Sequence, residues 1–343
     1  MSEFRTVTGF EDVWRPPVRP RTRRPETVLR DGAGKGVRAR LARIAARTPE
    51  VMVKVTGRTR EPAHLAAHLS YITRNGQLLA EGPDGLPIEG RQEVLDLARA
   101  WSAEALMDSQ RRANTPMSVA IILSMPAGTD ALRLRDAARA FAREAFEDRF
   151  EYVLALHTDT AHPHVHLTVN ALGANGERLN PRKADLEAWR QAFARCLRER
   201  GLAAEATPRR ARGVTRKAER GPVRRLRERH QKGQGALGRV AADKIRDAAR
   251  AAFGKGIAAA DWDRRIAERQ QRVRRLYLAQ AKLLQTSDRA DDRELGRSVE
   301  AFVRSMAPPD TERLALARAL REANRKARGD REPGGRERGG RSR

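Results

Sequence analysis

The chain has 343 residues, of which 40% are hydrophobic, 4% aromatic and 33% charged. This composition excludes one core that runs through the whole chain, and it favours a compact domain with charged extensions. The 70 lysines and arginines exceed the 44 aspartates and glutamates, giving a net charge of +26. Such an excess favours a polyanionic partner such as nucleic acid.

The first 48 residues contain the run RPPVRPRTRRPE, followed by GAGKG, with little hydrophobic periodicity. Proline and arginine at this density predict a disordered basic N-terminal arm over residues 1–48. The pattern changes at Val51, where VMVKVTG predicts a short strand and PAHLAAHLSYITR predicts a helix. Asn75 and Gly76 predict a turn. QLLAEGPDGLPIEG then predicts short extended pieces.

Helices and strands alternate through the rest of the region 49–205. The patterns predict a helix over 91–112, a buried strand over 117–125 and a helix over 129–148. Two strands follow, FEYVLALH and HVHLTVNAL, joined by TDTAHP, and then a helix over 183–200. This order predicts an α+β domain, in which a mainly antiparallel sheet carries helices on one face.

The composition shifts again after residue 205. The segment PRRARGVTRKAERGPVRRLRERHQK has 11 basic residues in 25, which predicts a basic linker over 206–238. Arginine and alanine alternate with leucine over 239–325, a pattern typical of two or three charged, solvated helices. Residues 326–343 predict a disordered tail rich in arginine and glycine.

The single cysteine, Cys196, excludes an internal disulfide framework and a thiolate zinc site. The N-terminal stretch MSEFRTVTGFEDVW lacks the apolar core of a signal peptide, and no apolar run of about 18 residues occurs. We therefore expect a cytoplasmic protein without membrane insertion.

The stretch HTDTAHPHVHLTVN, residues 157–170, holds four of the seven histidines. Strand alternation divides its last strand into a polar face with His164, His166, Thr168 and Asn170, and an apolar face with Val165, Leu167, Val169 and Ala171. The apolar face belongs to the core. The polar face is expected to be an open site, because a buried polar face without partners is costly.

A hairpin between the two strands brings His157 close to His164. Three imidazoles with open positions favour a divalent metal site, and a packed polar patch is the alternative. His162 and Asp159, in the connecting loop, are candidates for a further ligand or for a group that orients an imidazole.

Tyr71 shares one helical face with two histidines. His64, His68 and Tyr71 are spaced i, i+4 and i+7, and Arg74 follows one turn later. A phenol near a metal-bound phosphate is a candidate nucleophile that forms a covalent phosphodiester. The alternative is an amphipathic helix whose tyrosine covers the edge of the core, and the spacing alone does not decide between the two.

Two motifs now stand together, AHLSYITRNG ending at Gly76 and HTDTAHPHVHLTVN at 157–170. Together they resemble the relaxase or mobilisation nuclease family of the HUH endonuclease superfamily, which includes MobA-type plasmid proteins and the T-DNA border endonuclease. The first is similar to the family's tyrosine motif, and the second to its His-hydrophobic-His signature with an upstream HxD. The resemblance covers residues 50–200 and the basic segment that follows.

The resemblance implies an HUH/relaxase-like fold and a transesterase that nicks one DNA strand at an origin of transfer (oriT) to start conjugative plasmid mobilisation. By position, Tyr71 would attack the phosphate and form a 5′-phosphotyrosyl link. His157, His164 and His166 would hold Mg²⁺ or Mn²⁺. His68, Asp159 or His162 would accept the phenol proton, a choice that the sequence leaves open.

The resemblance also implies partners. Single-stranded DNA at oriT would contact a set of basic residues, namely Arg74, Arg209, Arg210, Arg212, Arg216 and Lys217. Accessory proteins of the relaxosome and a type IV coupling protein are expected, and the C-terminal run REPGGRERGGRSR is either a secretion signal or a solvated tail that binds DNA weakly.

Three other functions are alternatives, of which a metal-dependent hydrolase unrelated to DNA is disfavoured by the net charge of +26. A rolling-circle replication initiator shares the histidine motif, but its tyrosine normally follows that motif, whereas Tyr71 precedes it. A non-catalytic DNA-binding accessory protein explains the charge but leaves the three converging histidines unexplained.

Overall fold

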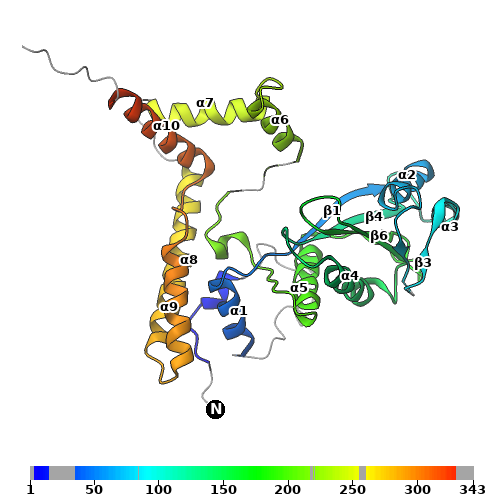
Figure 1. The fold of residues 1–343 in the computed structure, drawn as a ribbon, viewed down its shortest axis with the longest axis horizontal. Coiled ribbons are helices and arrows are strands. Elements are labelled where there is room, and N and C mark those ends of the chain that lie inside the picture. Colours follow the sequence, from blue (N-terminus) through cyan, green and yellow to red (C-terminus); the bar gives the residue numbers. More distant parts are fainter. Residues whose placement is uncertain are drawn as a thin grey trace, which may run out of the picture. The chain divides into compact units, whose positions relative to one another are not determined.

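The structure is a computed structural model that describes residues 4–14, 35–83, 85–216, 219, 221–254 and 260–329. These residues form two compact units (Figure 1). The first comprises the described parts of Met1–Thr6 and Trp14–Pro208, and the second those of Val7–Val13 and Arg209–Arg343.

The first unit is built on a six-stranded antiparallel sheet with the strand order β1-β4-β6-β5-β2-β3. Its strands are β1 (Met52–Thr59), β2 (Ala80–Glu81), β3 (Pro87–Ile88), β4 (Ser118–Ser124), β5 (Tyr152–His157) and β6 (His164–Asn170). Its helices are α1 (Lys35–Ala45), α2 (Pro62–Ile72), α3 (Gly90–Met107), α4 (Ala131–Phe146) and α5 (Lys183–Glu199). The antiparallel sheet confirms the predicted α+β class.

Helices cover both faces of this sheet, which corrects the expectation of helices on one face (Figure 1). One face packs on α4 and α5 through a large apolar cluster that includes Leu167, Phe141 and Phe193. The other face packs on α2 and α3 through a smaller cluster around Leu69 and Trp101. The sheet is therefore the middle layer of three.

Local signals fix ends of α2 and of α4, which lie on opposite faces of the sheet. Pro62 occupies the first turn of α2, where a missing N–H costs nothing. Helix α4 begins at Asp130, whose carboxylate accepts hydrogen bonds from the backbone N–H groups of Leu132 and Arg133 at 2.9 and 3.0 Å. Helix α2 ends at Thr73, and the chain then turns sharply towards β2.

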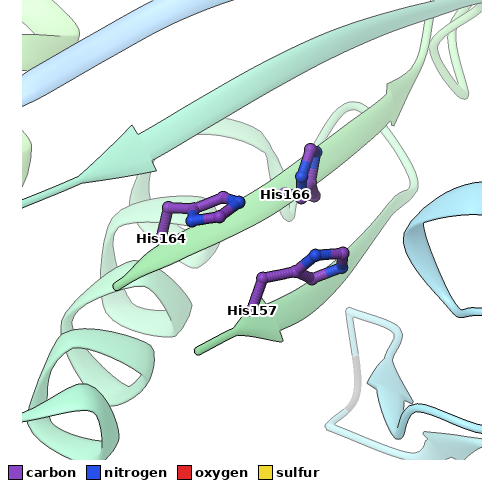
Figure 2. Close-up of side chains that lie close together, drawn as sticks. All are labelled: His157, His164 and His166. Carbon is purple, nitrogen blue, oxygen red and sulfur yellow. The ribbon is translucent and has the colours of Figure 1, made fainter. Parts of the chain in front are cut away.

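The pair β5–β6 carries the histidine stretch. His157 lies opposite His164 in the register, and His166 lies opposite Ala155. All three imidazoles project from the same face of the pair, the face that α2 covers (Figure 2). A hairpin between two strands of period two is sufficient to bring them together.

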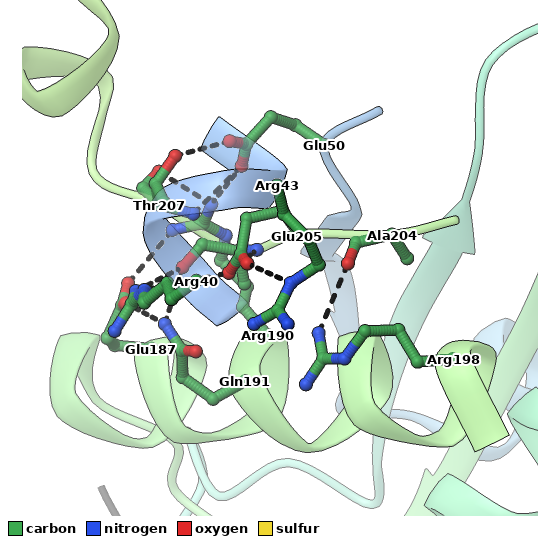
Figure 3. A network of polar contacts seen from close by, with 11 residues as sticks. Arg40, Arg43, Glu50, Glu187, Arg190, Gln191, Arg198, Ala204, Glu205 and Thr207 are labelled. Atoms are coloured by element: carbon green, nitrogen blue, oxygen red, sulfur yellow. Dashed lines mark hydrogen bonds and ion pairs between the residues drawn. The ribbon is translucent and has the colours of Figure 1, made fainter. Parts of the chain in front are cut away.

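Helix α1 is part of the first unit, which corrects the expectation that residues 1–48 form a disordered arm. Leu41 and Ile44 are buried. The guanidinium of Arg43 donates a hydrogen bond of 2.7 Å to the carboxylate of Glu205, which is itself buried (Figure 3). The backbone at Glu205 also pairs with Pro49 and Val51. The polar network of Figure 3 thus attaches α1 to the chain before β1 and after α5.

The second unit is helical. It contains two short 3-10 helices, η1 (Phe10–Val13) and η2 (Arg209–Arg212), and the helices α6 (Gly221–Gln231), α7 (Arg239–Phe253), α8 (Asp261–Gln285), α9 (Ala290–Arg304) and α10 (Glu312–Gly329). Tyr277 is fully buried there between Phe10 and Phe302.

These helices correct the other predicted segment boundaries. The predicted linker 206–238 contains η2 and α6, and the predicted two or three helices of 239–325 are α7, α8, α9 and α10, the last of which continues to Gly329. The rest of the predicted tail, residues 330–343, lies outside the described residues, as does most of the arm before α1. Among the described helices, none is both long and apolar enough to cross a membrane.

Candidate active site

Three imidazoles meet where β5 ends and β6 begins (Figure 2). The ring centroids of His157, His164 and His166 are 4.5 to 5.3 Å apart. Each ring offers one nitrogen, and these nitrogens lie within 4.8 Å of one another. Neutral imidazoles at this spacing suit a divalent cation and leave coordination positions for a substrate.

Backbone carbonyls orient two of the rings. The Nε2 atom of His157 donates to the carbonyl of Ile72 at 2.7 Å, and Nδ1 of His164 donates to the carbonyl of His162 at 3.1 Å. A carbonyl only accepts, so each contact fixes the N–H and leaves the other nitrogen with its lone pair. The free nitrogens are Nδ1 in His157 and Nε2 in His164.

The electrostatic environment keeps His166 neutral. Burial, followed by the neighbouring imidazoles of His157, His164 and His68, lowers the pKa of His166 from 6.5 to about 3. The pKa of His68 is also lowered, by burial and by His64. Since a metal binds the neutral form of imidazole, His166 needs no deprotonation at neutral pH before it can act as a ligand.

The rest of the polar face of β6 is buried, which corrects the expectation of an open face. Thr168 and Asn170 are 0% and 1% exposed, and both have partners. The imidazole Nε2 of His68 contacts the hydroxyl of Thr168 at 2.9 Å, and the amide of Asn170 donates to Glu104 at 3.1 Å. The face is therefore closed by α2 and α3 except at its histidine end.

Tyr71 stands on α2 beside this end. Its ring meets the ring of His166 edge-on, with centroids 6.0 Å apart and planes at 90°. The side chain of Tyr71 is 67% exposed, so a substrate in solvent can reach the phenol. The contacts His68–Thr168 and Tyr71–His166 are successive links between the same helix and the same strand. The alternative that Tyr71 covers the core edge does not fit this exposure.

Arg74 and Asp159 form an ion pair of 2.7 Å. Asp159 also lies 3.9 Å from Nδ1 of His157. Tyr71, Arg74, His157 and Asp159 share the lining of one pocket of about 610 Å³. The structure thus brings the predicted nucleophile, one predicted ligand and two predicted polar residues to the same pocket.

Residues 83–202 match the family model described as "Relaxase: MobA/VirD2-like, nuclease domain". These residues are therefore similar to a relaxase nuclease domain. The range that matches the relaxase model includes the three histidines, and Tyr71 precedes it.

Curated relatives extend this likeness. The T-DNA border endonuclease VirD2 of Rhizobium radiobacter is 28% identical over 184 residues, and that of Agrobacterium fabrum is 30% identical over 186 residues. Each alignment covers 48% of this chain, which spans 43% and 41% of the length of these relatives. A structure from work on the "Molecular Basis of Vancomycin Resistance Transfer in Staphylococcus aureus" aligns over 47% of this chain and 99% of its own, with 14% identity and a TM-score of 0.31, a value too low to carry an argument.

Among the described residues, the other predicted residues are not in the lining of the pocket beside Tyr71. His162 is exposed in the loop between β5 and β6. Arg209, Arg210, Arg212 and Arg216 belong to the second unit, and Lys217 lies outside the described residues. Arg209 and Arg216 are exposed, whereas the guanidinium of Arg210 donates to the backbone carbonyl of Asp12 at 2.9 Å.

Sequence reasoning missed the groups that hold the candidate site together. The carbonyl of Ile72 orients His157, and a backbone carbonyl leaves no trace in the sequence. Alternation put Thr168 on the histidine face, but nothing in the sequence indicated that His68 would bind it. Those two residues are 100 positions apart.

Proposed function

We propose that this chain is a DNA relaxase that cleaves one strand of DNA by transesterification, with Tyr71 as the nucleophile. The observation that carries the proposal is the exposed phenol of Tyr71 against His166, a member of a three-histidine cluster. A nucleophile, a cation site and a basic chain are what phosphoryl transfer to a tyrosine needs. The match to the relaxase model and the likeness to T-DNA border endonucleases support the same reaction.

In the proposed step, the phenolic oxygen of Tyr71 forms a bond to the scissile phosphorus. The bond from phosphorus to the 3′-oxygen of the preceding nucleotide breaks, and that oxygen leaves as a 3′-hydroxyl once it gains a proton. The 5′ end of the following nucleotide stays attached to the protein. One phosphodiester replaces another, so no water is consumed and the strand can later be rejoined.

The phenol proton needs an acceptor, because tyrosine has a pKa of about 10 in water. Of the three candidates, Asp159 has the best support, since it lines the same pocket as Tyr71. His68 is engaged by Thr168 through Nε2, and His162 is exposed in the loop. Arg74 holds Asp159 in an ion pair, and a phosphate that draws Arg74 away would free the carboxylate.

The three histidines fit a divalent cation, for which we propose Mg²⁺ or Mn²⁺. Their spacing and the neutral state of His166 support this assignment, and His157 and His164 have orienting carbonyls. A bound cation would polarise the scissile phosphate and offset the charge that develops on it. Ile72, whose carbonyl orients His157, is the last residue of α2, the helix that carries Tyr71.

We further propose that the substrate is single-stranded DNA at an origin of transfer, and that the reaction initiates conjugative plasmid mobilisation in the cytoplasm. The net charge of +26 supports a DNA partner, with salt-sensitive contacts from Arg74 and from the arginines at 209–216. Relaxosome accessory proteins and a type IV coupling protein are the proposed protein partners.

Covalent capture tests the proposal. The protein is incubated with Mg²⁺ or Mn²⁺ and labelled single-stranded oligonucleotides tiled across the intergenic DNA next to its gene, and the products are separated on denaturing gels. We expect DNA label at the mass of the protein, lost with EDTA and in Tyr71→Phe. Tyr152→Phe, the same change at a tyrosine in the core on the other face of the sheet, should retain it.

Each other outcome has a definite meaning. A label that persists in Tyr71→Phe moves the nucleophile elsewhere. Tight DNA binding without an adduct on any oligonucleotide and with either metal overturns the enzyme and supports the non-catalytic accessory protein.

A further inference from the structure

We propose that the pocket beside Tyr71 receives one nucleobase of the DNA strand, next to the scissile phosphate, and that the side-chain amides of Asn75 and Gln77 read the edge of that base. This inference rests on the proposed function, since it assigns a base-reading role to the wall of the same pocket. It adds to that function a source of sequence specificity.

The pocket has a reactive wall and a polar wall. Tyr71, His157 and Asp159 form the first, and Ser70, Asn75 and Gln77 contribute to the second. Its volume of about 610 Å³ lies within the range of pockets that hold small organic ligands. A group bound there would lie in direct contact with the proposed nucleophile.

Backbone contacts hold the turn after α2 in one conformation. The N–H of Asn75 donates to the carbonyl of Ser70 at 2.7 Å, and the N–H of Leu78 donates to the carbonyl of Thr73 at 2.9 Å. The hydroxyl of Thr73 accepts from the N–H of Gly76 at 3.2 Å. The side chains of the turn therefore project from a backbone with a fixed conformation.

The packing of Gly76 closes this turn against α3. Its φ is +81°, and a Cβ atom there would lie 2.2 Å from the carbonyl carbon of Gly90. Arg74 and Asn75 also have positive φ, 51° and 58°, a conformation that is costly for residues with side chains. Local strain that the surroundings enforce is found mainly at functional sites.

The polar wall is not used by the protein itself. Within the described part of the chain, the amides of Asn75 and Gln77 and the hydroxyl of Ser70 have no hydrogen-bond partner. All three lie on the rigid turn or directly before it. Because the backbone that carries them is held in place, a ligand that binds these groups has only their side chains to order.

The charge of the pocket favours a base over a phosphate. Its cation, Arg74, is paired with its anion, Asp159, at 2.7 Å, so the walls carry no net charge. A side-chain amide presents a donor beside an acceptor, which complements the edge of a base. A phosphate subsite would instead need an unpaired cation, whereas Arg74 is held by Asp159.

A randomised library tests the inference and requires no assumption about where the nick site lies. The full chain is incubated with Mn²⁺ and single-stranded DNA that contains a random segment, and the covalently attached strands are sequenced. The variants are Asn75→Gly, which removes the amide but tolerates a φ of 58°, and Gln77→Ala. Gln110→Ala, at an exposed amide in the loop before β4, is the matched control.

We expect the wild type to prefer one base at a position adjacent to the attached nucleotide. Asn75→Gly or Gln77→Ala should weaken that preference about five- to hundredfold at this position alone, the range for one base-edge contact. Gln110→Ala should leave every position unchanged. Adducts of normal yield with unchanged preferences in both variants overturn the inference and leave the proposed function intact. A uniform loss of yield without a change of preference also overturns it, because it indicates a phosphate subsite.

A binding measurement decides the inference if the wild type forms no adduct, an outcome that contradicts the proposed function. Fluorescence anisotropy then compares the affinities for labelled decamers of dA, dC and dT. Discrimination among them by the wild type that is lost in Asn75→Gly supports base reading. Equal affinities, or ratios unchanged by the substitution, overturn it.

Discussion

Both faces of β6 are buried along most of the strand, but they are held in different ways. Val165 and Leu167 on one face are 0% exposed, and Thr168 on the other is also 0% exposed. The first face packs on α4 and α5 through apolar contacts, which have no preferred direction. The second is tied to α2 by a hydrogen bond at defined atoms, His68 to Thr168, and the adjacent strand β5 is tied to α2 by another, His157 to Ile72.

The apolar face therefore mainly determines the stability of the domain, and the polar face mainly determines the positions of the site residues. Apolar burial contributes about 25 cal/mol per Å² wherever the surface is covered, so the first face stabilises the domain without specifying atomic distances. A hydrogen bond contributes only about 1 kcal/mol net, but its geometry is strict. The second face therefore determines where Tyr71 stands relative to the histidines. Substitutions on the two faces should then affect different measurements.

The largest effect on stability is expected on the apolar face. Leu167→Ala removes a fully buried side chain and leaves a cavity between the sheet and α4, which should cost about 2–5 kcal/mol of unfolding free energy. Urea denaturation measures this loss. Adduct formation per folded molecule should stay near the wild-type value. A change below about 1 kcal/mol would show that this face is not the main source of stability.

A smaller loss of stability is expected on the polar face. Thr168→Val keeps the shape but removes the partner of His68, at a cost of about 1–2 kcal/mol. Adduct formation per folded molecule should fall, because α2 loses one of the hydrogen bonds that tie it to the histidine strands.

The double variant His68→Leu, Thr168→Val sharpens this test. Replacing both partners by apolar groups removes the unsatisfied nitrogen, so the free energy of unfolding should return towards that of the wild type. Adduct formation should stay low, because the directional contact is still absent. Recovery of both quantities together would contradict the separation of the two faces.

The sequence was informative where a pattern is local. A period of two along HVHLTVN is enough to separate Val165 from His166, and the loop TDTAHP is short enough to force the hairpin that brings in His157. The spacing of His68 and Tyr71 on one helix was equally direct. These local regularities predicted the histidine cluster and the helix of the tyrosine.

The sequence did not predict features that depend on residues far apart along the chain. Nothing in the sequence of α2 and α3 says which face of the sheet they cover, because that depends on where the chain crosses the sheet. The arginine-rich run before α1 outweighed the spacing of Leu41 and Ile44, the signal that could have indicated a helix. The buried Glu205 that binds Arg43 lies 162 positions away.

The pH dependence of the unfolding free energy should distinguish the two faces, because His166 lies on the polar one. Its pKa is about 3 in the folded protein and near 6.5 in the unfolded chain. The unfolded state therefore binds more protons below about pH 6.5, and stability should fall as the pH drops from there towards 3. His68, whose pKa is also lowered, contributes with the same sign.

Urea denaturation at pH 7.5, 6.5 and 5.5 tests this sign. The decline should be shallower in His166→Gln, which has no titrating group at that position. A variant on the apolar face such as Leu167→Ala should keep the wild-type slope. An equal slope in His166→Gln would exclude His166 as a source of the decline.

The smallest effect on stability is expected at the exposed rim of the polar face. Asp159 is about half exposed and pairs with an equally exposed Arg74, and such pairs contribute only about 0–1 kcal/mol. Asp159→Asn should therefore leave unfolding nearly unchanged. If Asp159 accepts the phenol proton, the same variant should slow adduct formation, with the deficit shrinking as the pH rises towards the pKa of tyrosine. His162→Gln, at an exposed imidazole in the same loop, should keep the wild-type rate at every pH. A reversed result would make His162 the acceptor and Asp159 only the partner of Arg74.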